Sequence, residues 1–161
     1  MEVVITNKIE GINLDKLMDL YEESNRENLS MVESNPGEKT DKNILYQKVR
    51  ESYKAYIKNE FLKEGKNRLA ILIDGEKYFA GLRIYDEGKF YLLEALETNP
   101  IYRRMGYGER LVREVVKSLE RGKEIRAEVG LSNKKSLALH KKVGFKPKIK
   151  EESHWVLSIR G

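Results

Sequence analysis

The sequence predicts a single mixed α+β domain whose central sheet has about six or seven strands and is flanked by about four helices. Three patterns predict this class: apolar residues at helical spacing before residue 65, three strand-length apolar runs with tight-turn signals between them, and alternating helix and strand patterns after Pro100. A length of 161 residues is typical of one domain. Strands joined by tight turns pair antiparallel, and parallel neighbours need a crossover, so we expect a mostly antiparallel, partly parallel sheet.

The first third of the chain, residues 1–65, is expected to be helical. A first helix follows Asn13, a suitable N-cap, with apolar residues spaced by three and four up to Tyr21. The Pro-Gly pair inside Ser34–Thr40 predicts a loop. Asp41 then caps a longer helix that ends at Gly65 and whose apolar face holds Leu45, Val49, Tyr53, Tyr56, Ile57 and Phe61.

The middle of the chain predicts a three-stranded antiparallel meander from Arg68 to Thr98. The strands are RLAILI, YFAGLRIY and FYLLEALET, and the turns between them are DGEK and DEGK. Pro100 cannot sit in a central strand, so the third strand ends before it.

After Pro100, helices and strands alternate. An amphipathic helix ends near Gly122, and EIRAEVGL follows as a strand. A short helix runs from a cap at Ser132 or Asn133 to Gly144. KPKIK and HWVLSIR are the last two strands; HWVLSIR is apolar enough that we expect it to be an edge that needs covering, which leaves monomer and homodimer both open.

Composition excludes several classes of protein. The net charge of +5 is modest, so a dedicated nucleic-acid binder is not expected. The chain has no cysteine, no secretory signal pattern and no apolar run of bilayer length, so we expect a cytoplasmic protein without a membrane partner. No set of His, Asp and Glu stands at metal-ligand spacing, and we therefore expect no metal.

The segment RRMGYG, Arg103 to Gly108, predicts an anion site. A helix N-terminus leaves N–H groups unsatisfied and carries positive partial charge, and glycine lets backbone approach an anion closely. Arg103 and Arg104 add charge-assisted contacts, so we expect the segment to hold a pyrophosphate. It is not a P-loop, because no Gly-Lys-Ser/Thr follows, and it is not a G-x-G-x-x-G dinucleotide motif, because Leu111 occupies the third glycine position.

Two motifs together resemble the GNAT superfamily of acyl-CoA-dependent N-acyltransferases. ALETNPIYRRMGYGERLV resembles that family's cofactor segment, with R-x-x-G-x-G opening a helix after a strand and a proline. NKKSLALHKKVGF resembles the second signature, N-x-x-A-x-x-x-Y-x-x-x-G-F, and matches it at Asn133, Gly144 and Phe145. Ser136 replaces the usual alanine and His140 replaces the usual tyrosine. The likeness covers about Arg68 to the C-terminus.

The resemblance implies a sheet in which two strands splay apart to admit the pantetheine arm of acetyl-CoA, the cosubstrate. Backbone groups of Leu96, Glu97 and Thr98 would bind the arm, and backbone amides of Arg104, Met105, Gly106, Tyr107, Gly108 and Glu109 would bind the pyrophosphate. Asn133 and Ser136 would reach the cosubstrate from the second strand and helix. Lys134, Lys135 and Lys141 would meet the 3′-phosphate, or would be solvated surface lysines. Within one domain, 1–161, residues 1–65 would form the acceptor side and residues 66–161 the acyl-CoA-binding core.

The implied reaction is direct transfer of an acetyl group to a primary amine in a ternary complex. A main-chain N–H near Thr98 would bind the oxyanion. His140 would protonate the departing thiolate in place of the tyrosine, or would only pack. The family's best-known base position holds Leu92, so we rank Glu94, acting through water, first as the base. Strand alternation places Glu97 on the opposite face, with Leu93 and Ala95, unless a β-bulge intervenes, and we rank it lower.

The acceptor is expected on the side of the first helices. Glutamates there would attract a small cationic amine, or would be ordinary surface charges: Glu22, Glu23, Glu27 and Glu33. Two other readings stay open. A protein of the same fold without catalysis would be an acyl-CoA-binding sensor or partner domain, and the five lysines of His140–Lys150 would suit a nucleic-acid-binding module.

Overall fold

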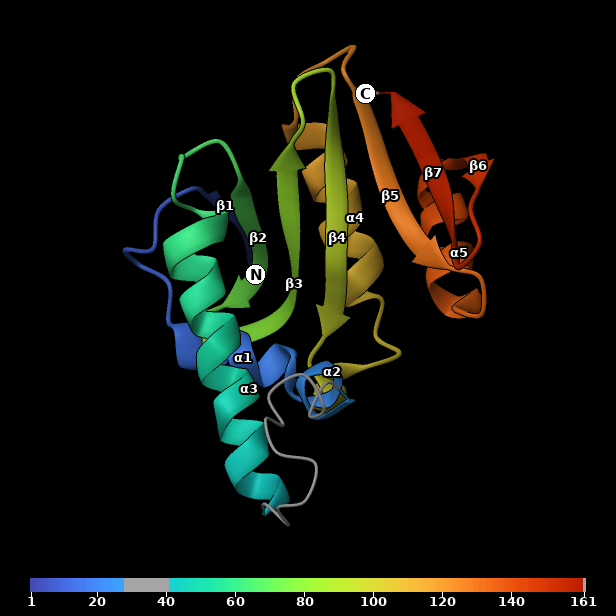
Figure 1. Ribbon diagram of the computed structural model, residues 1–161. Helices are drawn as coiled ribbons and strands as arrows, with labels where there is room; N and C mark the ends of the chain where they lie inside the picture. Colours follow the sequence, from blue (N-terminus) through green and yellow to red (C-terminus); the bar gives the residue numbers. More distant parts are fainter. Residues whose placement is uncertain (28–40, 161) are drawn as a thin grey trace.

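A computed structural model of the chain describes residues 1–27 and 41–160. Within them, a seven-stranded sheet has the order β1-β2-β3-β4-β5-β7-β6 (Figure 1). Only β4 and β5 pair parallel, which confirms the mixed sheet. In chain order the strands are β1 (Glu2–Thr6), β2 (Arg68–Asp74), β3 (Lys77–Asp86), β4 (Phe90–Thr98), β5 (Glu124–Gly130), β6 (Lys146–Lys150) and β7 (His154–Arg160).

Helices cover both faces of the sheet. The helices α1 and α3 lie on one face, while α4 and α5 lie on the other (Figure 1). The side chains of Asn13 and Asp41 accept N-terminal hydrogen bonds, which confirms both predicted caps, and Asn133 rather than Ser132 caps α5. The helices are α1 (Leu14–Leu20), α2 (Glu22–Glu27), α3 (Lys42–Tyr56) with its π-helical continuation η2 (Ile57–Phe61), the 3₁₀ turn η3 (Pro100–Tyr102), α4 (Tyr107–Ser118) and α5 (Lys134–Val143).

The sheet separates two hydrophobic cores, and β2 contributes to both. Leu69 and Ile71 pack with α1 and η2, while Ala70 and Leu72 pack with α4 on the opposite face. A strand buried on both faces has no reason to alternate apolar and polar residues. This double burial explains why RLAILI reads as a continuous apolar run.

The N-terminal strand β1 was not among the predicted elements. Residues Glu2–Thr6 pair antiparallel with β2, so the prediction that the first third begins with a helix is wrong. The available signal was the run Val3, Val4 and Ile5, because β-branched residues favour strands. The predicted loop Ser34–Thr40 and Glu33 lie outside the described residues.

The predicted sheet edge is also wrong. The strand β7 lies between β5 and β6, so HWVLSIR is an interior strand, and β6 forms the edge. The edge strand KPKIK is exposed along its whole length and carries three lysines and a proline. Lysines and proline discourage pairing with another chain, so this edge is protected by its own sequence.

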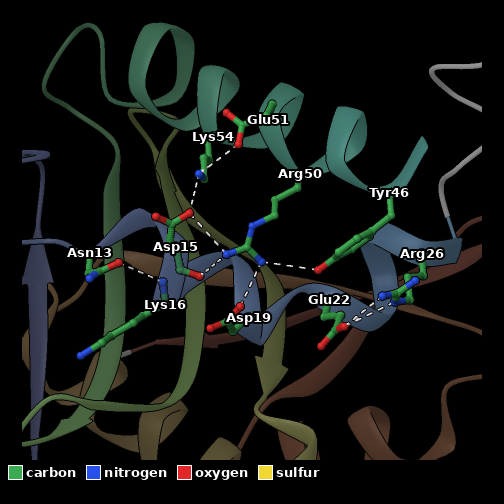
Figure 2. Close-up of polar contacts among 10 residues, drawn as sticks. All are labelled: Asn13, Asp15, Lys16, Asp19, Glu22, Arg26, Tyr46, Arg50, Glu51 and Lys54. Atoms are coloured by element: carbon green, nitrogen blue, oxygen red, sulfur yellow. Dashed lines mark hydrogen bonds and ion pairs between the residues drawn. The ribbon is translucent and has the colours of Figure 1, made fainter. Parts of the chain in front are cut away.

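A group of ion pairs joins α1 to α3 (Figure 2). The Arg50 guanidinium donates to the Asp15 carbonyl oxygen at 2.8 Å and to Asp19 Oδ1 at 3.0 Å. Lys54 Nζ adds a contact to Asp15 Oδ1 at 2.5 Å. These contacts hold α1 and α3 together in the layer that covers one face of the sheet. None of the helices in the described part of the chain is long and apolar enough to cross a membrane.

Candidate active site

The parallel strands β4 and β5 diverge and open a cleft. They pair only from Phe90 with Glu124 to Leu93 with Ala127, and their C-terminal ends separate beyond that point (Figure 1). A cavity of about 210 Å³ occupies the divergence. Its lining includes the side chains of Glu94, Leu96, Glu97, Glu128, Asn133, Ser136 and His140. The structure therefore brings together the predicted residues of β4, Asn133 and α5.

A β-bulge changes which side chains of β4 share a face. Arg83 pairs with Glu94 and Gly81 pairs with Glu97, so β4 uses three steps where β3 uses two. Ala95 has a left-handed φ of 56°, and Tyr21 Oη donates to its carbonyl oxygen at 2.8 Å. Because Gly81 and Arg83 lie on one face, their partners Glu94 and Glu97 do too. The prediction from simple alternation, with Glu97 on the opposite face, is wrong.

The two carboxylates of β4 have different surroundings. Burial raises the pKa of Glu94, while Arg83, whose Nη2 lies 3.7 Å from Glu94 Oε2, lowers it. Burial raises the pKa of Glu97 to about 7, Arg103 lowers it, and Glu23 raises it further. Glu97 forms no ion pair within residues 1–27 and 41–160, so its carboxylate stays available to a ligand.

The segment before α4 presents backbone N–H groups. Arg104 and Gly106 have left-handed φ values of 66° and 79°, and α4 begins directly afterwards at Tyr107. Gly106 supplies no side-chain cap, and the first N–H groups of a helix lack intrahelical acceptors. The helix has 12 residues, which gives its N-terminus a full dipole. This geometry fits a pyrophosphate.

The two glycines of this segment have different roles. Gly106 needs positive φ, and a Cβ built on it would meet nothing within 4 Å. Gly108 is buried, and a Cβ on it would lie 3.3 Å from both Thr98 Oγ1 and Leu139 Cδ1. Gly108 therefore lets the start of α4 pack tightly against the end of β4 and against α5.

The charged residues of this region are partly engaged within the protein. Arg103 Nη2 lies 2.5 Å from Glu23 Oε2, so the Arg103 side chain points toward α2. The Glu109 carboxylate pairs with Arg113 and Lys142, so its negative charge is balanced within the protein. The backbone N–H of Glu109 can then donate to an anion. Further predicted contacts are exposed: Arg104, Met105, Lys134, Lys135 and Lys141.

His140 is buried, with 4% of its surface exposed. Its Nδ1 lies 2.7 Å from the Ser136 carbonyl oxygen, which can only accept, so Nδ1 carries the proton. Burial lowers the pKa of His140, and the imidazole is therefore neutral near pH 7 with a lone pair on Nε2. To act as an acid from Nε2, His140 must first gain a proton there.

Some residues of the site were not predicted. They are Glu128, which lines the cleft from β5, and Arg83, which lies beside Glu94. Tyr21 was expected beside a cationic acceptor, but not as the residue that supports the bulge. The signal for Glu128 was its polar position in the alternating strand EIRAEVGL, whereas Arg83 and Tyr21 depend on contacts distant in sequence. No three His, Asp or Glu side chains gather as a metal site among the described residues.

Comparisons with known proteins bear on the fold. Residues 82–156 match the family described as FR47-like protein. A PaiA N-acetyltransferase from Thermoplasma acidophilum, solved with coenzyme A, superposes with a TM-score of 0.72 at 20% identity, over 100% of both chains. An N-acetyltransferase from Staphylococcus aureus gives 0.66 at 14% identity, covering 97% of this chain and 100% of that one. A GNAT-family acetyltransferase from Bacillus cereus gives 0.65 at 16% identity, covering 99% and 98%.

No curated protein sequence matches the chain. The resemblance inferred from the two motifs is nevertheless confirmed at the level of the fold, since structures described as N-acetyltransferases superpose over nearly the whole chain with TM-scores of 0.65–0.72. The chain therefore has the GNAT acetyltransferase fold, and its residues 82–156 are similar to the FR47-like family.

Proposed function

We propose that the protein is an N-acetyltransferase that moves an acetyl group from acetyl-CoA to a primary amine of a small cationic acceptor. The observation that carries this proposal is the cleft between β4 and β5 together with the uncapped N-terminus of α4, where Gly108 packs against Thr98 at the end of β4. A thioester arm fits the cleft and a pyrophosphate fits the helix start. The Thermoplasma relative, whose structure contains coenzyme A, supports the same ligand for this chain.

Acetyl-CoA would be held mainly by backbone. Leu96, Glu97 and Thr98 would bind the pantetheine arm along the free side of β4, beyond the last pair with β5. The amides from Arg104 to Glu109 would bind the pyrophosphate, with Arg104 adding charge. Asn133 Oδ1 caps α5 by accepting from Ser136 N at 3.1 Å, so Asn133 would approach the ligand through its amide nitrogen. Lys134, Lys135 and Lys141 lie exposed on α5, where their ammonium groups would form ion pairs with a 3′-phosphate.

The reaction needs no covalent enzyme intermediate. The amine nitrogen attacks the thioester carbonyl carbon, the C–S bond breaks, and the products are an amide and coenzyme A. A lysine-like ammonium has a pKa of about 10.4, so it must lose a proton before attack. A main-chain N–H near Thr98 would bind the oxyanion. A carboxylate of the cleft would take the amine proton; the sequence ranks Glu94, acting through a water, ahead of Glu97, and both line the cavity.

His140 stands where the family places its tyrosine. As a neutral imidazole with the proton on Nδ1, it would protonate the thiolate only after Nε2 had gained a proton from the reacting amine or from solvent. If His140 does not protonate it, coenzyme A leaves as the thiolate, which is a weaker base than an alkoxide and therefore a better leaving group. Replacing His140 with Ala leaves kcat and its pH profile unchanged in the second case.

The acceptor would bind on the acidic side of the cleft. Glu94, Glu97 and Glu128 line it, and Glu23 and Glu27 on α2 stand close enough to raise the pKa of Glu97. Carboxylates whose negative charge is not balanced by neighbouring cations attract a cationic ligand. A diamine, a polyamine or an amino-acid amide therefore suits the site better than an anionic amine.

A second candidate is an acyl-CoA-binding domain without catalysis. Leu92 at the family's base position and His140 at its tyrosine position favour it. Turnover separates the two functions, because a pure binder releases no coenzyme A when amines are added.

Two measurements test the proposed function. Thermal shift with acetyl-CoA, coenzyme A and ATP should show stabilisation by the two CoA species at concentrations where ATP has little effect, because a ligand of the native state raises the melting temperature. Release of free thiol is then followed with a panel of cationic and anionic amines. Faster release with the cationic members supports the proposal. Stabilisation without release from any amine supports the binding domain instead.

A further inference from the structure

The bulge in β4 creates a second carboxylate in the cleft, with surroundings unlike those of Glu94. Glu94 has a cationic partner in Arg83, and three tyrosine rings surround that guanidinium at 5.5–5.7 Å, so Arg83 is held in place beside Glu94. Glu97 has no such partner within the described ranges. Both side chains line the same cavity. The sequence ranks Glu94 first as a base, whereas the surroundings favour Glu97.

We propose that Glu97 is the base of the acetyl transfer, taking the proton of the acceptor ammonium directly, and that Glu94 serves mainly to attract the acceptor. This assignment rests on the proposed function. It places first, as the base, a side chain that the sequence ranks below Glu94.

The backbone around Glu97 is fixed from both sides. Before it, Tyr21 Oη holds the Ala95 carbonyl at 2.8 Å, and after it, Asn99 N donates to the Phe79 carbonyl at 2.9 Å. The partner of Glu97 across the strand pair is Gly81. A base must be held within hydrogen-bond reach of its proton, and this double anchoring supplies that.

Apolar packing beside Glu97 explains its weak acidity. A Cβ built on Gly81 would lie 3.0 Å from Leu20 Cδ1 and 3.6 Å from Leu17 Cδ1, so α1 packs directly over this glycine. The leucines therefore pack on the face of the sheet that Gly81 shares with its partner Glu97. Removing water disfavours the charged carboxylate, in agreement with a pKa of about 7.

Charged and titratable groups from every neighbouring element face this carboxyl. They are Tyr21 at the end of α1, Glu23 and Glu27 on α2, Tyr53 on α3 and Arg103 after η3. Glu94 on β4 and Glu128 on β5 line the same cavity, and Arg83 on β3 lies beside Glu94. Of the two cations, Arg83 lies beside Glu94, and Arg103 lies 2.5 Å from Glu23. The tyrosines stay neutral, because burial raises the pKa of Tyr21 and of Tyr53.

The proton balance of the step is simple. Glu97 as a carboxylate removes one proton from the ammonium and becomes a carboxylic acid. The free nitrogen lone pair forms the N–C bond, and the C–S bond then breaks. The nitrogen loses its second proton, and one of the two protons reaches the thiolate while the other enters solvent. A base with a pKa near the working pH suits this task because it is both available and able to give the proton back.

The test compares Glu97→Gln with Glu94→Gln in pH profiles of kcat/KM from pH 5.5 to 9.5, using a diamine acceptor. The wild-type profile should rise with a midpoint near 7 and then level off. Glu97→Gln should lose about 10²–10³-fold at pH 7, the usual contribution of a positioned base. Its remaining rate should climb steadily toward the pKa of the free amine. Glu94→Gln should keep the midpoint near 7, whatever its effect on acceptor KM.

A second measurement does not depend on activity. The side-chain carboxyl ¹³C signals of glutamate-labelled protein are titrated, and the signal that Glu97→Gln removes should have a midpoint near 7. Both variants should be stabilised by acetyl-CoA as the wild type is, because neither change touches the backbone that binds it. A rising limb near pH 7 that survives in Glu97→Gln and disappears in Glu94→Gln overturns the assignment alone. Absence of turnover in the wild type overturns the proposed function together with it.

Discussion

Replacing Gly106 with Ala tests whether the segment before α4 holds the pyrophosphate. Gly106 has a φ of 79°, and its surroundings are open, with no atom within 4 Å of a built Cβ. An alanine there meets no clash from neighbours, so its effect comes only from the left-handed backbone. That conformation costs an L-residue about 1–2 kcal/mol relative to glycine. With nothing packed around it, the segment in the free variant should relax away from this conformation.

Acetyl-CoA must then restore the left-handed turn when it binds. A cost of about 1–2 kcal/mol corresponds to roughly 5–30-fold weaker binding, since about 1.4 kcal/mol is tenfold in Kd. The melting temperature of the free protein should fall by no more than about 2–8 °C, the range that 1–2 kcal/mol produces in a domain of this size. Isothermal titration with acetyl-CoA measures the affinity, and a thermal scan measures the stability.

Gly122 provides a matched control. Its φ is 82°, it also has nothing within 4 Å of a built Cβ, and it lies in the turn between α4 and β5, at the opposite end of α4. Gly122→Ala should change stability to the same extent and leave the acetyl-CoA Kd within about twofold of wild type. Equal affinities for Gly106→Ala and Gly122→Ala would refute the reasoning, because the anion site would then not depend on the backbone at Gly106.

Two further predictions concern stability. Arg50→Met removes the guanidinium that joins α1 to α3 (Figure 2) and should lower the free energy of unfolding by about 1–3 kcal/mol in urea titrations, because hydrogen bonds to charged groups contribute that much. The control Lys66→Met breaks only the exposed pair with Glu64 and should change the free energy of unfolding by no more than about 0.5 kcal/mol. Equal losses in the two variants would contradict the structural role of Arg50. Glu124 is buried, which raises its pKa, but Lys148, Ser158 and Arg126 outweigh burial and hold it at about 2. A folded pKa below the ordinary value of 4.5 stabilises the fold above pH 4.5, and that stabilisation, on the order of 3 kcal/mol, is lost as the pH falls toward 2. Acid unfolding of Glu124→Gln should therefore start from a less stable protein and show a shallower fall between pH 4.5 and 2, and an unchanged curve would count against the contacts of Glu124.

Much of the fold follows from signals within a few residues. The caps at Asn13 and Asp41 mark their helices because each side chain satisfies an N–H group only two or three positions away. The turns DGEK and DEGK predict the meander from four residues each. The glycines before α4 likewise indicate a backbone of positive φ at that point. These features depend on local chemistry, which the sequence states directly.

The features that escaped prediction depend on partners distant in the chain. The strand β1 is short and gains its place by pairing with β2, more than sixty residues later. The position of β7 inside the sheet follows from its pairing with β5 on one side and β6 on the other. Nothing within HWVLSIR itself distinguishes an interior strand from an edge.

The bulge at Ala95 is also set by residues distant in sequence, and it decides which side chains of β4 line the cleft. A non-glycine residue at positive φ costs about 1–2 kcal/mol, so the local sequence LEALE gives no reason to expect it. The hydrogen bond from Tyr21 and the pairing of Glu97 with Gly81 offset that cost from elements far away in sequence. Because a bulge reverses the alternation beyond it, one strained residue decides whether Glu97 faces the core of α4 or the cleft. The face of β4 on which Glu97 lies is therefore set by the packing of α1 on β3 and β4, and the carboxylate proposed as the base is one that simple alternation ranks low.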